Sequence, residues 1–141
     1  MIAIGSDHGG YILKEKIIEH LSARGIEYKD YGTFSGESCD YPVYAKKVAS
    51  AVVTNSCDKG ILVCGTGIGM CIVANKIPGI RAALCGDCFS AEAARLHNNA
   101  NILTLGARVI GNGLALKIVD IFLDTPFSNE ERHIRRISEI E

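Results

Sequence analysis

The chain has 141 residues, with 15 lysines and arginines against 16 aspartates and glutamates, for a formal net charge of −1. This near balance argues against a broad nucleic-acid or anionic-membrane surface, and no apolar run approaches membrane-spanning length. The length is typical of one domain, residues 1–141, large enough to fold without disulfides. The start of the chain lacks a signal-peptide pattern, so we expect a soluble, cytoplasmic protein whose six cysteines are thiols.

Short apolar segments alternate with helical patterns along the chain. Strands are expected at residues 2–4, 26–31, 60–64, 81–85 and 102–105. Helices are expected after residue 10 up to Gly25, from Pro42 through Val53, and over residues 68–76, 90–97, 114–123 and 129–140. Alternation of this kind is typical of βαβ crossovers and predicts an α/β fold with a parallel sheet covered on both faces.

The most informative stretch is residues 60–70, Gly-Ile-Leu-Val-Cys-Gly-Thr-Gly-Ile-Gly-Met. Cys64 ends an apolar strand, and glycines at every second position let the backbone turn sharply and point its amides at an anion. Met70 stands where a dinucleotide fingerprint needs glycine and where a phosphatase-type loop needs arginine, and the P-loop lysine is missing. The loop alone leaves open a tight turn with a buried cysteine.

Reactive side chains follow three of the expected strands. Asp7 and His8 follow the first, Cys64 to Gly69 the third, and Arg108 the fifth. Ligands of parallel sheets bind at the carboxyl ends of strands, so these positions predict a catalytic site. A helix N-terminus can lower a thiol pKa from about 8.5 to roughly 3.5–7.5, and each amide that stabilises a developing oxyanion is typically worth about 2.7–4 kcal/mol.

Other candidates have plain alternatives. His97 and Asn98 could simply close a helix. Arg132 and Arg136 lie four residues apart and, with Arg108, would form a bidentate phosphate clamp, although a solvated helix face is the common alternative. Cys85 and Cys88 form a lone CxxC without the partners of a zinc site. A thiol, an oxyanion cradle, histidines and a clamp together indicate proton abstraction next to a carbonyl, without a metal or cofactor.

Motifs throughout the chain resemble type B ribose-5-phosphate isomerases. They are Gly5-Ser6-Asp7-His8-Gly9-Gly10, Asp40-Tyr41-Pro42, residues 60–69, Ala74-Asn75-Lys76, Gly79-Ile80-Arg81-Ala82, His97-Asn98, Gly106-Ala107-Arg108 and Arg132-His133-x-x-Arg136. The resemblance implies interconversion of ribose 5-phosphate and ribulose 5-phosphate, within a group that includes galactose-6-phosphate and allose-6-phosphate isomerases. It implies a three-layer, Rossmann-like sandwich whose five strands lie in the order 2-1-3-5-4. It also implies a homodimer or tetramer with active sites shared between subunits.

The resemblance also implies a role for each matched residue. Cys64 corresponds to the base that moves a proton between C1 and C2, and His97 to the acid that opens the sugar ring. The anion hole corresponds to Gly65, Thr66, Gly67, Ile68 and Gly69, with Thr66 also available to a sugar hydroxyl. Substrate contacts correspond to Asp7, His8 and Asn98, and the phosphate clamp to Arg108, Arg132 and Arg136. A branch of the family has a glutamate as its catalytic base at the position of Met70. Methionine cannot accept a proton, so the resemblance is to the branch that uses a cysteine.

Two alternatives of a different class remain at this point. A sugar-phosphate sensor on the same fold would use the glycine loop only to hold phosphate and would show no turnover. A thiol redox protein would depend on Cys85 and Cys88 and would be indifferent to Cys64.

Overall fold

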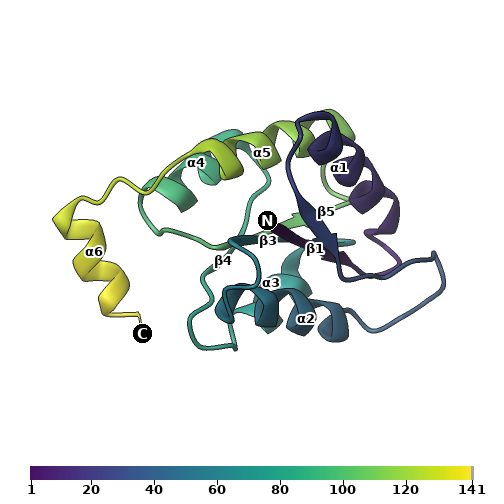
Figure 1. Ribbon diagram of the computed structural model, residues 1–141, viewed down its shortest axis with the longest axis horizontal. Helices are drawn as coiled ribbons and strands as arrows, with labels where there is room; N and C mark the ends of the chain where they lie inside the picture. The colour runs from purple at the N-terminus through teal and green to yellow at the C-terminus, as the bar shows by residue number, and fades with distance from the viewer. Residues whose placement is uncertain (141) are drawn as a thin grey trace.

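The computed structural model describes residues 1–140 and has one five-stranded parallel sheet. The strand order is β2-β1-β3-β5-β4, as the resemblance implies (Figure 1). The strands are β1 (Ile2–Ser6), β2 (Tyr28–Asp30), β3 (Lys59–Cys64), β4 (Ala82–Leu84) and β5 (Ile102–Gly106). The predicted α/β fold is confirmed.

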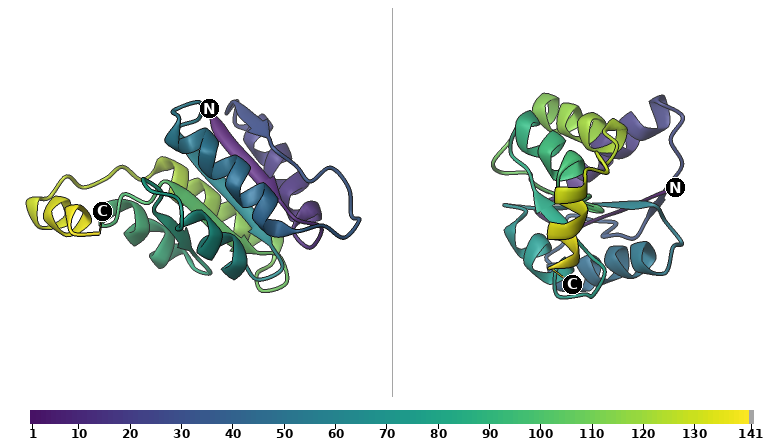
Figure 2. Two further views of the ribbon diagram at one scale, coloured as in Figure 1. Left: turned by 90° about the horizontal axis from the view of Figure 1, so that it is seen from below. Right: turned by 90° about the vertical axis from the view of Figure 1, so that its left-hand side faces the viewer.

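Helices cover both faces of the sheet (Figures 1 and 2). They are α1 (Tyr11–Ala23), α2 (Tyr41–Val53), α3 (Ile68–Ala74), α4 (Cys88–Leu96), α5 (Asn112–Asp124) and α6 (Glu131–Ser138). Helices α1, α4 and α5 pack on one face, and α2 and α3 pack on the other. Helix α6 stands away from the sheet, at the end of an extended stretch that follows α5 (Figure 1).

The central strand β3 is buried on both faces, which is typical of parallel sheets. Ile61 and Val63 belong to the core beneath α1 and α5, whereas Leu62 and Cys64 belong to the core beneath α2 and α3. Side chains alternate between the two faces of a strand. The last residue of β3 therefore places its thiol at the carboxyl edge of the sheet, on the side of α2 and α3.

Several boundaries differ from the sequence expectation for local reasons. Helix α4 begins at Cys88 rather than at residue 90, because the Asp87 side chain accepts the Ser90 N–H and caps it. Helix α6 begins at Glu131 rather than at residue 129, because Asn129 has φ of +59° and cannot continue a helix. As predicted, Gly25 lies just beyond the end of α1, with φ of +70°.

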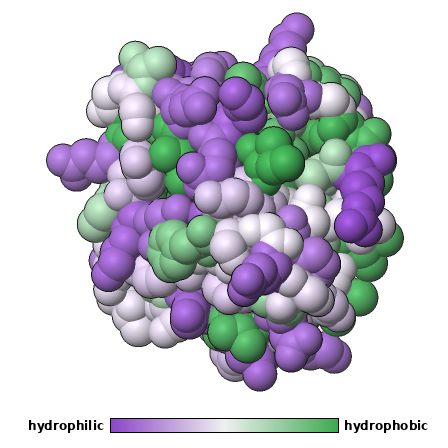
Figure 3. All heavy atoms as spheres, turned by 90° about the vertical axis from the view of Figure 1, so that its right-hand side faces the viewer, coloured by the Kyte–Doolittle hydropathy of each residue, from purple (hydrophilic) through white to green (hydrophobic). Residues whose placement is uncertain are grey.

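The loop between β2 and α2 is tied to the body by a buried lysine. The Nζ of Lys14 is 2.8 Å and 2.6 Å from the two carboxylate oxygens of Asp30, and Asp30 Oδ1 also accepts the Gly32 N–H at 2.9 Å. The loop projects at the right of Figure 1. Figure 3 looks at this side and shows separate hydrophobic groups among hydrophilic side chains.

The helices of residues 1–140 include none with the length and hydrophobicity to cross a membrane.

Candidate active site

A cleft of about 430 Å³ opens at the carboxyl edge of the sheet, where Asp7, Cys64 and Arg108 follow or end β1, β3 and β5. The rest of its lining comes from Tyr41, Gly65, Thr66, Ile68, Gly69 and Ile72. Parallel sheets bind ligands at this edge. The structure thus brings three of the strand-end residues together where a substrate is expected.

The Cys64 thiol lies in the floor of this cleft, with 5% of the residue exposed. Its Sγ accepts a hydrogen bond from the Gly67 backbone N–H at 3.0 Å. Gly67 has φ of +78°, a conformation that residues with a Cβ rarely adopt. The loop thereby turns back over the sulfur and presents the positive end of an amide dipole to it.

The remaining amides of the loop are either satisfied or available. The Ile68 N–H donates to Thr66 Oγ1 at 3.2 Å and closes the turn before α3. Among the described residues, nothing accepts from the amides of Gly65, Thr66 or Gly69. Three backbone donors next to Cys64 are therefore available to an anionic oxygen.

The guanidinium of Arg108 lies against two glycine turns at the cleft. A Cβ on Gly65 would be 3.1 Å from its Nη1, and a Cβ on Gly9 would be 3.5 Å from its Nη2. The Arg108 backbone N–H donates to the Gly65 carbonyl at 2.9 Å, which fixes where the side chain starts. The guanidinium makes no ion pair within residues 1–140, so its charge is available to a bound anion.

Asp7 and His8 have different surroundings. Asp7 lines the cleft, and its Oδ1 accepts the Gly10 N–H at 3.0 Å. The His8 ring meets the loop between β2 and α2 instead, where its Nδ1 accepts the Cys39 backbone N–H at 3.2 Å. Because an amide N–H can only donate, Nδ1 carries no proton, and the neutral ring has its proton on Nε2. His8 is thus placed to donate a hydrogen bond from Nε2.

Two residues that line the cleft, Tyr41 and Ile72, do not follow a strand and were not predicted as site residues. The Tyr41 ring covers the glycine loop so closely that a Cβ on Gly69 would lie 2.6 Å from Tyr41 Cε2. The motif Asp40-Tyr41-Pro42 was its only signal, since it places Tyr41 at the start of α2. Ile72 lies one turn after Ile68, and the two are 56% and 51% exposed. They form an exposed apolar stripe on α3 next to the cleft.

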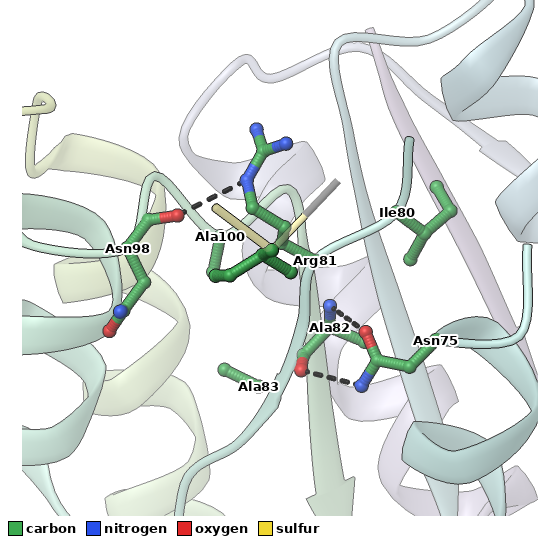
Figure 4. Close-up of a pocket in the computed structure, with 8 residues that line it drawn as sticks. Asn75, Ile80, Arg81, Ala82, Ala83, Asn98 and Ala100 are labelled. Atoms are coloured by element: carbon green, nitrogen blue, oxygen red, sulfur yellow. Dashed lines mark hydrogen bonds between the residues drawn. The ribbon is translucent and has the colours of Figure 1, made fainter. Parts of the chain in front are cut away.

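His97 and Asn98 lie at the opposite edge of the sheet. They follow α4 and precede β5, and the Asn98 carbonyl accepts a hydrogen bond from Arg81 Nε at 3.1 Å, as Figure 4 shows. Cys64 pairs with Gly106 at the far end of β5, whereas His97 and Asn98 come before Ile102 at its start. At about 3.3 Å per residue, the length of β5 puts about 13 Å between these two levels. A single chain therefore does not bring His97 or Asn98 to the Cys64 sulfur.

Asn98 lines a pocket of about 340 Å³ at this edge (Figure 4). Asn75 and Arg81 line it as well. The Asn75 amide is held by the backbone of Ala82, accepting its N–H at 2.8 Å and donating to its carbonyl at 3.0 Å. The surroundings of Asn98 are thus built by the segment between α3 and β4, in a pocket separate from the one that holds Cys64.

Arg132 and Arg136 also lie away from the cleft, on α6. Arg132 Nη2 pairs with Glu130 Oε2 at 2.9 Å on the surface. The helix contacts the body where His133 stacks on His97, with ring centroids 4.6 Å apart and an interplanar angle of 18°. A single chain therefore groups these arginines with His97 and leaves Arg108 with Cys64.

The family of the chain follows from a comparison of its sequence with known families. The model described as Ribose/Galactose Isomerase matches residues 2–140. The chain belongs to this family. Membership makes it an isomerase, and the match extends from β1 to the end of α6 and so includes both groups of candidate residues.

Members of the family with curated names are similar to this chain over nearly its whole length. Ribose-5-phosphate isomerase B of Escherichia coli (strain K12) is 49% identical over 139 residues, which are 99% of this chain and 93% of that protein. Ribose-5-P isomerase B of Listeria innocua is 54% identical over 127 residues, 90% of this chain and 86% of that protein.

Solved structures of the family have the same fold. Clostridium thermocellum ribose-5-phosphate isomerase B has a TM-score of 0.97 and 53% identity, covering 99% of this chain and 93% of its own. The Mycoplasma genitalium ribose-5-phosphate isomerase B structure with bound ribulose-5-phosphate has a TM-score of 0.94 and 44% identity, covering 99% and 92%.

Proposed function

We propose that this isomerase interconverts ribose 5-phosphate and ribulose 5-phosphate through an enediolate, in the non-oxidative pentose phosphate pathway and without a cofactor. One observation carries the proposal. The Cys64 sulfur lies in a cleft with three available backbone amides and an arginine that has no ion-pair partner among residues 1–140. A related protein, 44% identical, has been solved with bound ribulose-5-phosphate.

In this proposal Cys64 is the base. Its thiolate removes the proton from C2 of the open-chain aldose, and the electron pair of that bond forms the C1–C2 double bond while O1 becomes an oxyanion. The amides of Gly65, Thr66 and Gly69 stabilise the oxyanion, and the Thr66 hydroxyl contacts a sugar hydroxyl. The thiol then returns the proton to C1, and the O2 proton passes to O1, which leaves the ketose.

Substrate binding is divided between the two ends of the molecule. Asp7, which lines the cleft, accepts hydrogen bonds from sugar hydroxyls, and His8 donates from Nε2 to a sugar or phosphate oxygen. Arg108 contributes the cleft's own positive charge to the phosphate site. Arg132 and Arg136, four residues apart on α6, supply the rest of the clamp from the other end.

We infer that the two ends meet between subunits of a homodimer. Cys64 and Arg108 of one subunit would form the site with His97, Asn98, Arg132 and Arg136 of a neighbour. The separation of these groups within one chain supports this, and so does the position of α6 apart from the sheet (Figure 1). The exposed stripe of Ile68 and Ile72 on α3 gives apolar surface beside the cleft for the neighbour to cover.

His97 would act before the proton transfer. Furanose opening breaks the bond between C1 and the ring oxygen, gives that oxygen a proton and removes one from the C1 hydroxyl. An imidazole can supply the first proton and accept the second. Asn98, the next residue, would contact the same sugar.

The length of the preferred sugar is tested separately from the reaction. One relative, 49% identical over 127 residues, is named D-erythrulose-4-phosphate isomerase of Pectobacterium atrosepticum. A substrate panel of four-, five- and six-carbon sugar phosphates in D₂O, followed by NMR, distinguishes the possibilities. We expect deuterium at C1 or C2 and the fastest turnover with the five-carbon pair. Absence of both turnover and exchange with every sugar would instead identify a binding protein.

A further inference from the structure

The stacked pair of His97 and His133 has features that the proposed reaction does not use. His97 ends α4, and His133 is in the first turn of α6. His133 is the single buried residue of α6, with 7% exposed, and its Nε2 has no hydrogen-bond partner within residues 1–140. Burial of an unpaired ring nitrogen costs free energy. The ring contact therefore has to offset this cost.

The His97 ring has no hydrogen-bonded partner to orient it among the described residues. A histidine that transfers protons is usually held by a third group that bonds its second nitrogen. Here the group in contact with the ring is the face of His133, at 4.6 Å and 18°. Face-to-face contact fixes the plane of the His97 ring without using either of its nitrogens as a hydrogen-bonding group.

The surroundings of His133 favour the neutral form of its ring. Burial, and then the proximity of His97 and Arg132, lower the pKa of His133 below its ordinary value, with Arg136 acting in the same direction and Glu130 opposing them. Two stacked imidazoles do not readily carry a proton at the same time. A neutral His133 is compatible with a protonated His97, whereas a charged His133 would oppose it.

We propose that His133 is a positioning residue, whose neutral ring holds the imidazole of His97 in the orientation that opens the sugar ring. The proposal rests on the proposed function, because it assigns His133 a role in the ring-opening step of that reaction. It differs from a merely structural role, in which His133 would anchor α6 and its arginines and act on phosphate binding alone.

The test compares His133→Phe, which keeps an aromatic face, with His133→Ala, which removes it. The first measurement is kcat and KM for ribose 5-phosphate, which is mainly cyclic. The second is the exchange of the C1 protons of ribulose 5-phosphate in D₂O, which starts from an open-chain ketose and bypasses ring opening. Misplacing a reacting group by about 1 Å can cost on the order of 100-fold. We expect His133→Ala to lower kcat for the aldose about tenfold or more, and His133→Phe to restore most of it.

The D₂O exchange of the ketose should fall much less than aldose turnover in His133→Ala. In a His97→Ala background, His133→Ala should have little further effect, because the two act as one unit. Equal losses in both reactions, a rise in KM alone, or a His133→Phe variant as slow as His133→Ala would overturn the proposal. If His133→Ala does not fold, His133→Gln, similar in size and not aromatic, takes its place. Wild-type inactivity in both reactions would overturn the proposed function itself, whereas an active wild type with equal losses in the two reactions would overturn only the role of His133.

Discussion

At the scale of single residues, the six thiols of the chain have unlike surroundings. Cys64 receives an amide hydrogen bond and lines the cleft, while Cys88 begins α4 on the opposite face of the sheet. Cys85 is buried, and its burial, followed by the charge of Asp87 and the proximity of Cys71, raises its pKa to about 11. Because the surroundings differ, substitution and alkylation of individual cysteines can test which thiol belongs to the active site.

Replacement of the proposed base should separate chemistry from binding. Cys64→Ala is expected to lower kcat for ribose 5-phosphate by about 10²–10⁴-fold, since a positioned base typically contributes that much. Affinity for the sugar phosphate, measured by calorimetry, should change little because the arginines are intact. Cys88→Ser is the matched control and should retain turnover. Normal activity of Cys64→Ala would remove this residue from the mechanism.

Cys85 should be inert toward alkylation at neutral pH. With a pKa near 11, its thiolate is about one part in a thousand at pH 8, and it becomes reactive only as the pH approaches that value. Mass spectrometry after iodoacetamide treatment of the native protein from pH 7 to 10 would measure this. Rapid labelling of Cys85 at pH 7, or its reversible oxidation with Cys88, would favour the redox alternative.

At the scale of elements, the glycine loop is fixed by backbone contacts. A Cβ on Gly67 would meet the Leu105 carbonyl carbon at 2.8 Å, in a residue with φ of +78°. A Cβ on Gly106 would lie 2.6 Å from the Thr66 carbonyl oxygen. The loop and β5 thus approach too closely for larger residues, which holds the sulfur and its amide donors in register.

Gly67→Ala should therefore destabilise the protein by about 2 kcal/mol or more, from the left-handed conformation together with the clash. Gly113→Ala in α5 is the matched control, because its Cβ meets nothing within 4 Å, and alanine should stabilise this helix by about 0.5–1 kcal/mol. Urea unfolding measures both free energies. Equal stability of the two variants would contradict this account of the loop.

Docking of α6 should depend on pH through His133. The pKa of His133 is lowered in the folded chain from its ordinary 6.5, so the unfolded chain takes up the proton first. Docking of α6 with a neutral His133 is therefore most favourable above about pH 6.5. Its contribution to the free energy of unfolding is lost progressively as the pH falls below that value. An NMR titration of the His133 ring should give a midpoint below 6.5. A midpoint above 6.5 would mean that the pair favours the charged form.

The sequence predicted the helices and strands better than it predicted the contacts between them. Apolar periodicity indicated each strand and helix, because burial on one face repeats along the sequence. It did not predict that Cys39 contacts His8, or that Tyr41 covers Gly69, because those contacts join distant segments. The start of α6 was misplaced because the positive φ of Asn129 is not visible in an apolar pattern.

At the scale of the whole molecule, the two groups of candidate residues lie at opposite ends. Cys64 and Arg108 are at the carboxyl edge of the sheet, and His97 is at the amino edge. Residue types and strand ends predicted the first group from the sequence. Helical spacing grouped Arg132 and Arg136 with Arg108, and the resemblance to a family joined His97 and Asn98 to Cys64. Apolar periodicity could not show that α4 runs back along the sheet and carries His97 away from Cys64.

Shared sites predict recovery of activity on mixing two inactive variants. A heterodimer of Cys64→Ala and His97→Ala subunits has one site with both defects and one site with neither. Random re-pairing should then restore about one quarter of wild-type turnover, because half of the dimers are mixed and half of their sites are intact. The measurement is activity after joint unfolding and refolding, against each variant refolded alone. No recovery would place the complete site within one chain.

If the site is shared between subunits as proposed, the position of α6 and His97 far from the sulfur would make turnover depend on protein concentration. Under the proposed sharing, dilution that separates the subunits leaves each subunit folded but inactive, with two incomplete parts of an active site. A two-fold arrangement leaves no half without its complement, whereas a head-to-tail chain of copies would strand one at each end. Under the proposed sharing, the layout of one subunit therefore favours a closed assembly over an open chain of copies.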